Sequence, residues 1–160
     1  MIFHINDKEQ WQPVVDKWRA EGKVIVTTNG TFDIVHVGHI RLMTEAKAQG
    51  DILILGLNSD KSVKQYKSEK RPIVPQEERA KLIEALRCID MVIIFDEPES
   101  ARFVTEVKPD IHAKDSTYGY DLIEAPIVAE YGGKIYLVEK DGHSTTNVIQ
   151  KIIDVYKDEL

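Results

Sequence analysis

Residues 23–39 read KVIVTTNGTFDIVHVGH, and this stretch decides the fold. Its first half is rich in β-branched residues, which predicts a buried strand at 23–28. Gly30 and Gly38 follow, and glycine lets a backbone come close to a ligand. The amphipathic residues 39–49 then predict a helix. A strand, a glycine-containing loop and a helix N-terminus in this order indicate an anion-binding unit, because the first N–H groups of a helix have no partner within it.

The alternation of apolar strands with amphipathic helices continues to the end of the chain. Strands are expected at 23–28, 52–57, 91–95, 110–113 and 134–138. One helix is expected before the first strand, and the others are expected at 39–49, 76–87, 99–107, 122–131 and 145–157. Such alternation is typical of a parallel sheet that helices cover on both faces. We therefore predict an α/β protein, a Rossmann-like three-layer α/β/α sandwich with a parallel five-stranded sheet.

Composition and charge restrict the class of protein. The chain has 160 residues, 42% of them apolar, so we expect one domain spanning residues 1–160. The formal net charge of −6 disfavours nucleic-acid binding, which needs a basic face. No apolar run approaches the roughly 20 residues that span a bilayer. With Cys88 as its one cysteine, the chain forms no internal disulfide. These features predict a cytoplasmic protein that binds neither nucleic acid nor membranes.

Two histidines, His36 and His39, stand where the first loop meets its helix. Residues three apart share one side of a helix, so both imidazoles are expected to face the same ligand. Imidazoles suit hydrogen bonding to the phosphoryl oxygens that gain charge during a displacement. Each histidine alone is also typical of a surface or capping residue. Their place between a buried strand and a helix favours the catalytic interpretation.

Two further segments carry groups that bind phosphate. Basic residues gather in the middle of the chain, at Lys61, Lys64, Lys67, Lys70, Arg71 and Arg79. This cluster is typical of a phosphate pocket or of a solvated face. Near the end, Ser144, Thr145 and Thr146 precede a helical pattern. A single helix cap needs one hydroxyl. Three of them at a helix N-terminus therefore indicate a second phosphate site.

These motifs together resemble the cytidylyltransferase-like nucleotidyltransferases. That family carries a Gly-x-Phe-Asp-x-x-His-x-Gly-His string, found here at residues 30–39, and a distant Ser-Thr-Thr, found here at 144–146. Within the family, the chain looks most like the adenylyltransferases of bacterial heptose biosynthesis, which make ADP-heptose from heptose 1-phosphate and ATP. The similarity covers nearly all of residues 23–153. Further matching strings lie at 56–60, 71–75, 77–79, 108–110 and 131–133.

The resemblance implies an enzyme that transfers a nucleotidyl group and releases pyrophosphate. It implies that the catalytic residues are His36, His39, Lys67 and Arg71. It implies nucleotide contacts from Thr28, Asn29, Gly30, Thr31, Phe32, Gly38, Asn58, Asp60, Arg79, Lys114, Ser144, Thr145 and Thr146. The sequence contains no metal-ligand cluster, so Mg²⁺ is expected to arrive with the nucleoside triphosphate. The expected ligands are ATP, or CTP, and a phosphorylated small-molecule acceptor.

A homodimer is also implied, since relatives of this size are commonly dimers. Trp11 and Trp18 in the N-terminal helix would then lie at its interface, or else cover the edge of the sheet.

Other interpretations share the same motifs. One is a cytidylyltransferase that acts on a polyol or amino-alcohol phosphate, and another is an FMN adenylyltransferase. A third is a non-catalytic module that binds nucleotide without turnover. The heptose enzymes usually read Lys-Gly-Gly-Asp-Tyr where residues 114–118 read Lys-Asp-Ser-Thr-Tyr. This loop is expected to border the acceptor and base pockets, so the acceptor stays open at this point.

Overall fold

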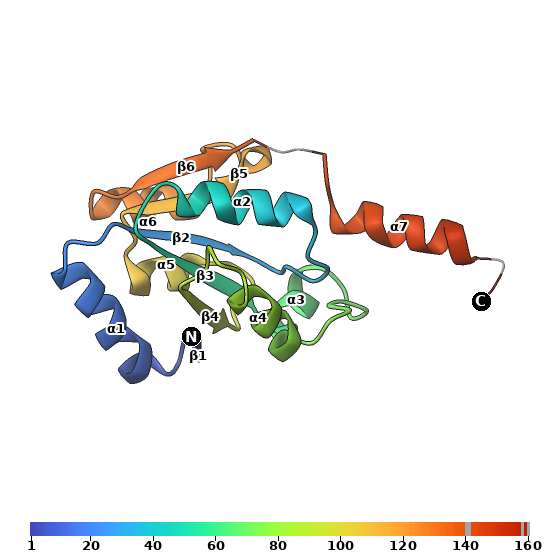
Figure 1. Cartoon of the computed structure of the whole chain (residues 1–160), viewed down its shortest axis with the longest axis horizontal. Coiled ribbons are helices and arrows are strands. Elements are labelled where there is room, and N and C mark those ends of the chain that lie inside the picture. The colour runs from blue at the N-terminus through green and yellow to red at the C-terminus, as the bar shows by residue number, and fades with distance from the viewer. Residues whose placement is uncertain (140–141, 158, 160) are drawn as a thin grey trace.

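In the part of the chain that the structure describes, residues 1–139, 142–157 and 159, six parallel strands form one sheet (Figure 1). The computed structural model gives them as β1 (Ile2–His4), β2 (Ile25–Gly30), β3 (Ile52–Asn58), β4 (Met91–Phe95), β5 (Ile111–Asp115) and β6 (Lys134–Val138). Their order across the sheet is β1-β4-β3-β2-β5-β6. The chain therefore moves to one side from β2 and later crosses to β5 on its other side. This reversal places a crevice at the carboxyl ends of β2 and β5, where open α/β sheets bind their ligands.

Helices cover both faces of the sheet, which confirms the predicted three layers. They are α1 (Lys8–Ala20), α2 (Val37–Lys47), α3 (Asp60–Tyr66), α4 (Gln76–Glu84), α5 (Ala101–Val107), α6 (Glu124–Glu130) and α7 (Thr145–Tyr156), with a short 3₁₀ helix η1 (Ser116–Tyr118). Side chains of α1, α5 and α6 pack on one face of the sheet, and those of α2 and α4 pack on the other. Every residue of β3 is buried, as expected for a strand between two helical layers.

The sheet has one strand more than the sequence predicted. β1 pairs with β4 at the edge of the sheet, with Ile2 opposite Val92. Three residues are too few to show a period of two, so no pattern identifies this strand. Helix α3 is also new, because the sequence patterns predicted neither a helix nor a strand for residues 58–74. The hydroxyl of Ser59 caps α3 by accepting the N–H of Ser62.

Helix α7 leaves the body of the molecule (Figure 1). None of its residues is buried, although its pattern is amphipathic. Its contact with the rest of the chain is concentrated at its first turn, where the hydroxyl of Thr145 lies 3.5 Å from the carbonyl oxygen of Ile34. Among the described residues, no helix is long and apolar enough to cross a membrane.

Candidate active site

A cavity of about 660 Å³ opens at the carboxyl ends of the central strands. Its volume lies within the range of about 300–1,000 Å³ that is usual for small-molecule sites. Most of the predicted site residues line it: Asn29, Gly30, Thr31, Phe32, His36, Gly38, His39, Asn58, Lys67, Arg71, Lys114, Ser144, Thr145 and Thr146. The fold therefore brings together the two motifs from opposite ends of the sequence.

The structure places three predicted residues, Thr28, Asp60 and Arg79, outside this cavity. Thr28 is fully buried within β2, and Arg79 is fully buried beneath the loops that border the site. Asp60 forms an ion pair with Arg79, with 2.7 Å between its Oδ1 and the guanidinium Nη2. Asp60 and Arg79 bind each other, and the nucleotide contacts that the resemblance implies for these three residues stay a prediction.

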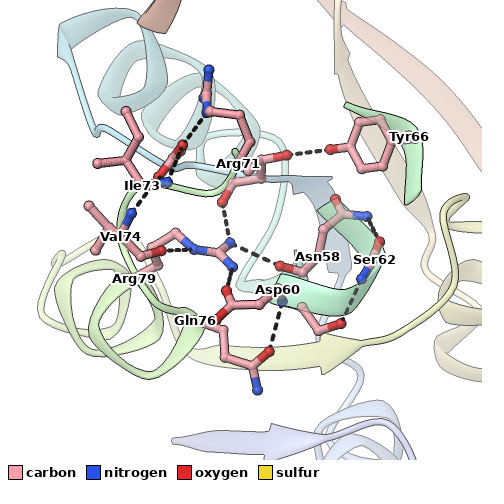
Figure 2. Close-up of polar contacts among 12 residues, drawn as sticks. Asn58, Asp60, Ser62, Tyr66, Arg71, Ile73, Val74, Gln76 and Arg79 are labelled. Carbon is pink, nitrogen blue, oxygen red and sulfur yellow. Dashed lines mark hydrogen bonds and ion pairs between the residues drawn. The ribbon is translucent and has the colours of Figure 1, made fainter. Parts of the chain in front are cut away.

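Arg79 connects three segments that surround the cavity (Figure 2). Besides its ion pair, its guanidinium donates to three backbone carbonyl oxygens, those of Val74 at 2.8 Å, Thr31 at 2.6 Å and Asn58 at 2.9 Å. These carbonyls belong to the loop before α4 and to the ends of β3 and β2. Arg79 thus holds the loops of the site in place from below.

His36 and His39 lie at the N-terminus of α2, in the wall of the cavity. Their rings stack, with centroids 3.7 Å apart. The backbone N–H of His36 donates to Nδ1 of His39 at 3.4 Å. A neutral His39 ring that accepts at Nδ1 carries its proton on Nε2. His39 is therefore prepared to donate a hydrogen bond from Nε2.

The position of the Phe32 ring favours a glycine at residue 30. Its φ of 48° lies in the left-handed region, which non-glycine residues seldom adopt. A Cβ at Gly30 would lie 3.1 Å from the Phe32 ring. The same ring meets the His39 ring edge-on, with centroids 5.1 Å apart. Gly30 thus makes room for the aromatic ring that supports His39, in addition to any approach to a ligand.

Lys67 and Arg71 bring positive charge to the same cavity. Desolvation lowers the pKa of Lys67, and the neighbouring Arg71 lowers it further. The Nη2 atom of Arg71 is buried and has no hydrogen-bond partner among the described residues. A buried donor without an acceptor is costly, so it indicates a ligand oxygen at this place.

Lys114 forms a buried network with Asn29 and Glu124. Its ammonium donates to Oδ1 of Asn29 at 2.7 Å and lies 3.2 Å from Oε1 of Glu124. The hydroxyl of Ser100 donates to the same carboxylate. Burial lowers the pKa of Lys114, whereas Glu124 opposes that shift. No sequence pattern points to Glu124, because an acidic residue in the first turn of a helix is ordinary.

His112 is fully buried next to this network, and its titration is expected to make the free energy of unfolding depend on pH. Burial lowers its pKa to about 3, helped by Lys114, while its Nδ1 lies 2.8 Å from the Thr27 hydroxyl. Between pH 6.5, which is the ordinary pKa of histidine, and pH 3, His112 is protonated in the unfolded chain and neutral in the folded chain. The free energy of unfolding is therefore expected to fall as the pH drops below 6.5, by up to about 1.4 kcal/mol per unit.

Urea denaturation at several pH values measures this slope. The variant His112→Asn retains a donor near the position of Nδ1 but cannot titrate, so it is expected to lose less stability than the wild type between pH 6.5 and 5. Equal slopes for the two proteins would contradict the assignment to His112.

Among the residues that the structure describes, no three or more His, Cys, Asp or Glu side chains are grouped to hold a metal ion. The cavity wall does contain carboxylates, at Glu99, Asp115, Asp121, Glu124 and Glu139.

Comparisons with known proteins agree with the geometry. The cytidylyltransferase-like family matches residues 27–151. The chain is 45% identical over 148 residues to the bifunctional protein HldE of Geobacter metallireducens, covering 91% of this chain and 30% of that protein. It is 40% identical over 150 residues to the bifunctional protein HldE of Caulobacter vibrioides, covering 92% of this chain and 31% of that protein. The chain thus spans about a third of the length of these relatives.

Two solved structures resemble the fold. The lipopolysaccharide core biosynthesis protein from Thermoplasma volcanium is 29% identical with a TM-score of 0.61, covering 77% of this chain and 100% of that one. Pantoate-beta-alanine ligase from Francisella tularensis, crystallised with beta-gamma ATP and beta-alanine, has a TM-score of 0.69 at 15% identity, covering 98% of this chain and 78% of that one. The family match extends over most of the chain and includes both motifs that meet in the cavity. The protein therefore belongs to the cytidylyltransferase-like family of nucleotidyltransferases, as its sequence motifs predicted.

Proposed function

We propose that this protein transfers AMP from ATP to heptose 1-phosphate and releases pyrophosphate. The observation that carries the proposal is the convergence of two helix N-termini, those of α2 and α7, with Lys67 and Arg71 on one cavity. Such an arrangement suits a polyphosphate, because helix starts and fixed cations both favour anions. The heptose acceptor is supported by the sequence resemblance and by the similarity to proteins named HldE.

In the proposed reaction, an oxygen of the acceptor's phosphate attacks the α-phosphorus of ATP. A bond forms between that oxygen and phosphorus, and the bond from the α-phosphorus to the α–β bridging oxygen breaks. The acceptor phosphate is already ionised at neutral pH, so it needs no general base. Catalysis then consists of positioning and of stabilising negative charge on the leaving pyrophosphate. His36, His39, Lys67 and Arg71 are the residues proposed for this task.

Mg²⁺ is proposed to enter with the nucleotide. When bound, it would neutralise charge on the phosphate oxygens. The described residues group no three side chains of the kind that would hold a metal on their own. The carboxylates that line the cavity would suit Mg²⁺, because proteins commonly bind this ion through one or two carboxylates together with substrate phosphates.

The cavity wall carries carboxylates as well as cations, and this supports a hydroxyl-rich acceptor. Lys67 and Arg71 line the cavity together with carboxylates, among them Asp115, Asp121 and Glu139. Carboxylates accept hydrogen bonds from hydroxyl groups. A sugar phosphate can therefore bind both kinds of group, with its phosphate on the cations and its hydroxyls on the carboxylates.

Pyrophosphate release with Mg²⁺ tests the proposal. ATP, CTP, GTP and UTP are each combined with heptose 1-phosphate, glycerol 3-phosphate and FMN. Release with ATP and heptose 1-phosphate alone is the expected result. Release with CTP and glycerol 3-phosphate, or with ATP and FMN, would move the activity to the corresponding alternative. Tight ATP binding without release from any pair would favour a non-catalytic module.

We also propose that residues 1–160 form one cytoplasmic domain that assembles as a homodimer through α7. Of the two candidate interface residues on α1, Trp11 is fully buried in its own core and Trp18 is partly buried against that core. In contrast, Ile152, Ile153 and Tyr156 on α7 are each about half exposed. A second α7 would cover this apolar face, which no part of the described chain covers.

Sedimentation velocity over a range of concentrations tests the dimer. The variant Ile152→Lys is expected to be monomeric where the wild type is dimeric, because it places a charge in the apolar face. The matched control is Leu82→Lys, because Leu82 is a similarly exposed apolar residue of α4. This variant is expected to stay dimeric. A wild type that is monomeric throughout would refute this assembly.

A further inference from the structure

We propose that Asp33 is a positioning residue, which holds the Arg71 guanidinium in the cavity wall so that it binds a phosphate oxygen of the ligand. The proposal deepens the proposed function, and it rests on that function for its activity measurement. Asp33 itself would not contact the reacting atoms.

The carboxylate of Asp33 is almost completely enclosed by the loop that carries Arg71. Its side chain is 1% exposed. Its Oδ1 accepts the backbone N–H groups of Ile73 and Val74, each at 2.8 Å, and its Oδ2 accepts Nε–H of Arg71 at 2.6 Å. Figure 2 shows the N–H groups of Ile73 and Val74 and the side chain of Arg71 turned toward this point. One carboxylate thus fixes both the backbone of the loop and the direction of its arginine.

Asp33 keeps its negative charge in this enclosure. Burial alone would raise the pKa of its carboxyl, but the N–H groups of Val74 and Ile73 and the Arg71 guanidinium lower it below the ordinary value. Both oxygens are engaged, so neither is available to act as a base or to hold a metal ion. Its remaining role is exerted through Arg71.

Arg71 has a donor left over after this contact. Asp33 takes Nε–H, whereas Nη2 is buried without a hydrogen-bond partner among the described residues. The guanidinium lines the cavity near Lys67, whose pKa it lowers. Positive charge and an unsatisfied donor in one wall favour an oxygen of a phosphate group, which guanidinium groups bind through charge-assisted hydrogen bonds.

A second anchor makes the positioning role separable from folding. Arg79 holds the same loop through the carbonyl of Val74, at 2.8 Å. In the variant Asp33→Asn this anchor stays in place, and the new side chain has nearly the same shape. The loop is therefore expected to keep its path, while the Arg71 guanidinium loses its charged partner.

A double-mutant cycle tests the proposal with inorganic pyrophosphate as the probe. Its affinity is measured by calorimetry for the wild type, Asp33→Asn, Arg71→Met and the double variant. Asp33→Asn is expected to weaken binding by about tenfold, as for a lost charge-assisted contact. In the Arg71→Met background it is expected to have no further effect. A tenfold loss in both backgrounds would overturn the proposal, because Asp33 would then act without Arg71.

Two further variants keep the test decisive. Asp60→Asn disturbs the neighbouring ion pair with Arg79, and its effect is expected to multiply with that of Arg71→Met instead of vanishing. If Asp33→Asn fails to fold, Arg71→Lys replaces it. Lysine keeps the charge but cannot bind Asp33 and a phosphate through one rigid fork, so weaker pyrophosphate binding is expected. Unchanged binding would overturn the proposal.

The activity measurement separates this inference from the proposed function. Coupling between Asp33 and Arg71 in pyrophosphate binding supports the positioning role even if no acceptor releases pyrophosphate. Normal turnover together with an uncoupled cycle would overturn the positioning role and leave the proposed function standing.

Discussion

His39→Ala is expected to lower turnover by about two orders of magnitude or more while the fold stays intact, as for loss of a donor to a developing oxyanion. His39 lines the cavity and accepts the backbone N–H of His36 at Nδ1, so a neutral His39 ring carries its proton on Nε2. Alanine cannot donate a hydrogen bond to the leaving pyrophosphate. Because the interaction strengthens as charge develops, kcat is expected to fall more than KM rises.

Steady-state kinetics with the substrate pair identified in the pyrophosphate screen measure this effect. Val37→Ala serves as the control, because Val37 lies in the same helical turn and is 57% exposed. It is expected to retain nearly full activity. A near-wild-type rate for His39→Ala, with thermal melting unchanged, would count against the role proposed for this histidine.

Arg79→Met is expected to lower the free energy of unfolding by about 3–5 kcal/mol, as for a buried ion pair that loses one partner. The arginine is fully buried, and its removal leaves three carbonyl oxygens and the Asp60 carboxylate without their donor. Methionine fills much of the volume, so the loss comes chiefly from these polar groups.

Urea denaturation at pH 7 measures the change. Arg87→Met is the matched control, since Arg87 is exposed, and it is expected to change stability little. A small loss of stability for Arg79→Met, combined with a large rise in the KM for ATP, would contradict the structural role. That outcome would return Arg79 to the nucleotide site that the sequence resemblance implied.

The predicted strands and helices came from local patterns, and the two missed elements show where such patterns end. β1 is a strand because the edge of β4 offers it hydrogen-bond partners, as in the contact from the N–H of Ile5 to the carbonyl oxygen of Ile94 at 2.8 Å. Helix α3 has a largely polar sequence, and it is held by its Ser59 cap and by burial of Val63. The pairing of β1 and the burial of Val63 depend on neighbours that lie far away in the sequence.

The sequence by itself determined the family, the layered sheet and the two phosphate-binding motifs. Periodicity, glycines and helix starts are local properties of a sequence. The motifs at residues 30–39 and 144–146 can therefore be recognised without knowledge of the fold. Only the tertiary structure decided which cations line the cavity. Arg71 and Arg79 lie eight residues apart in one basic cluster, yet Arg71 lines the cavity and Arg79 is buried beneath it. Arg71 is placed by the Asp33 carboxylate and Arg79 by the carbonyl oxygens of Thr31 and Asn58, and no local pattern contains that information.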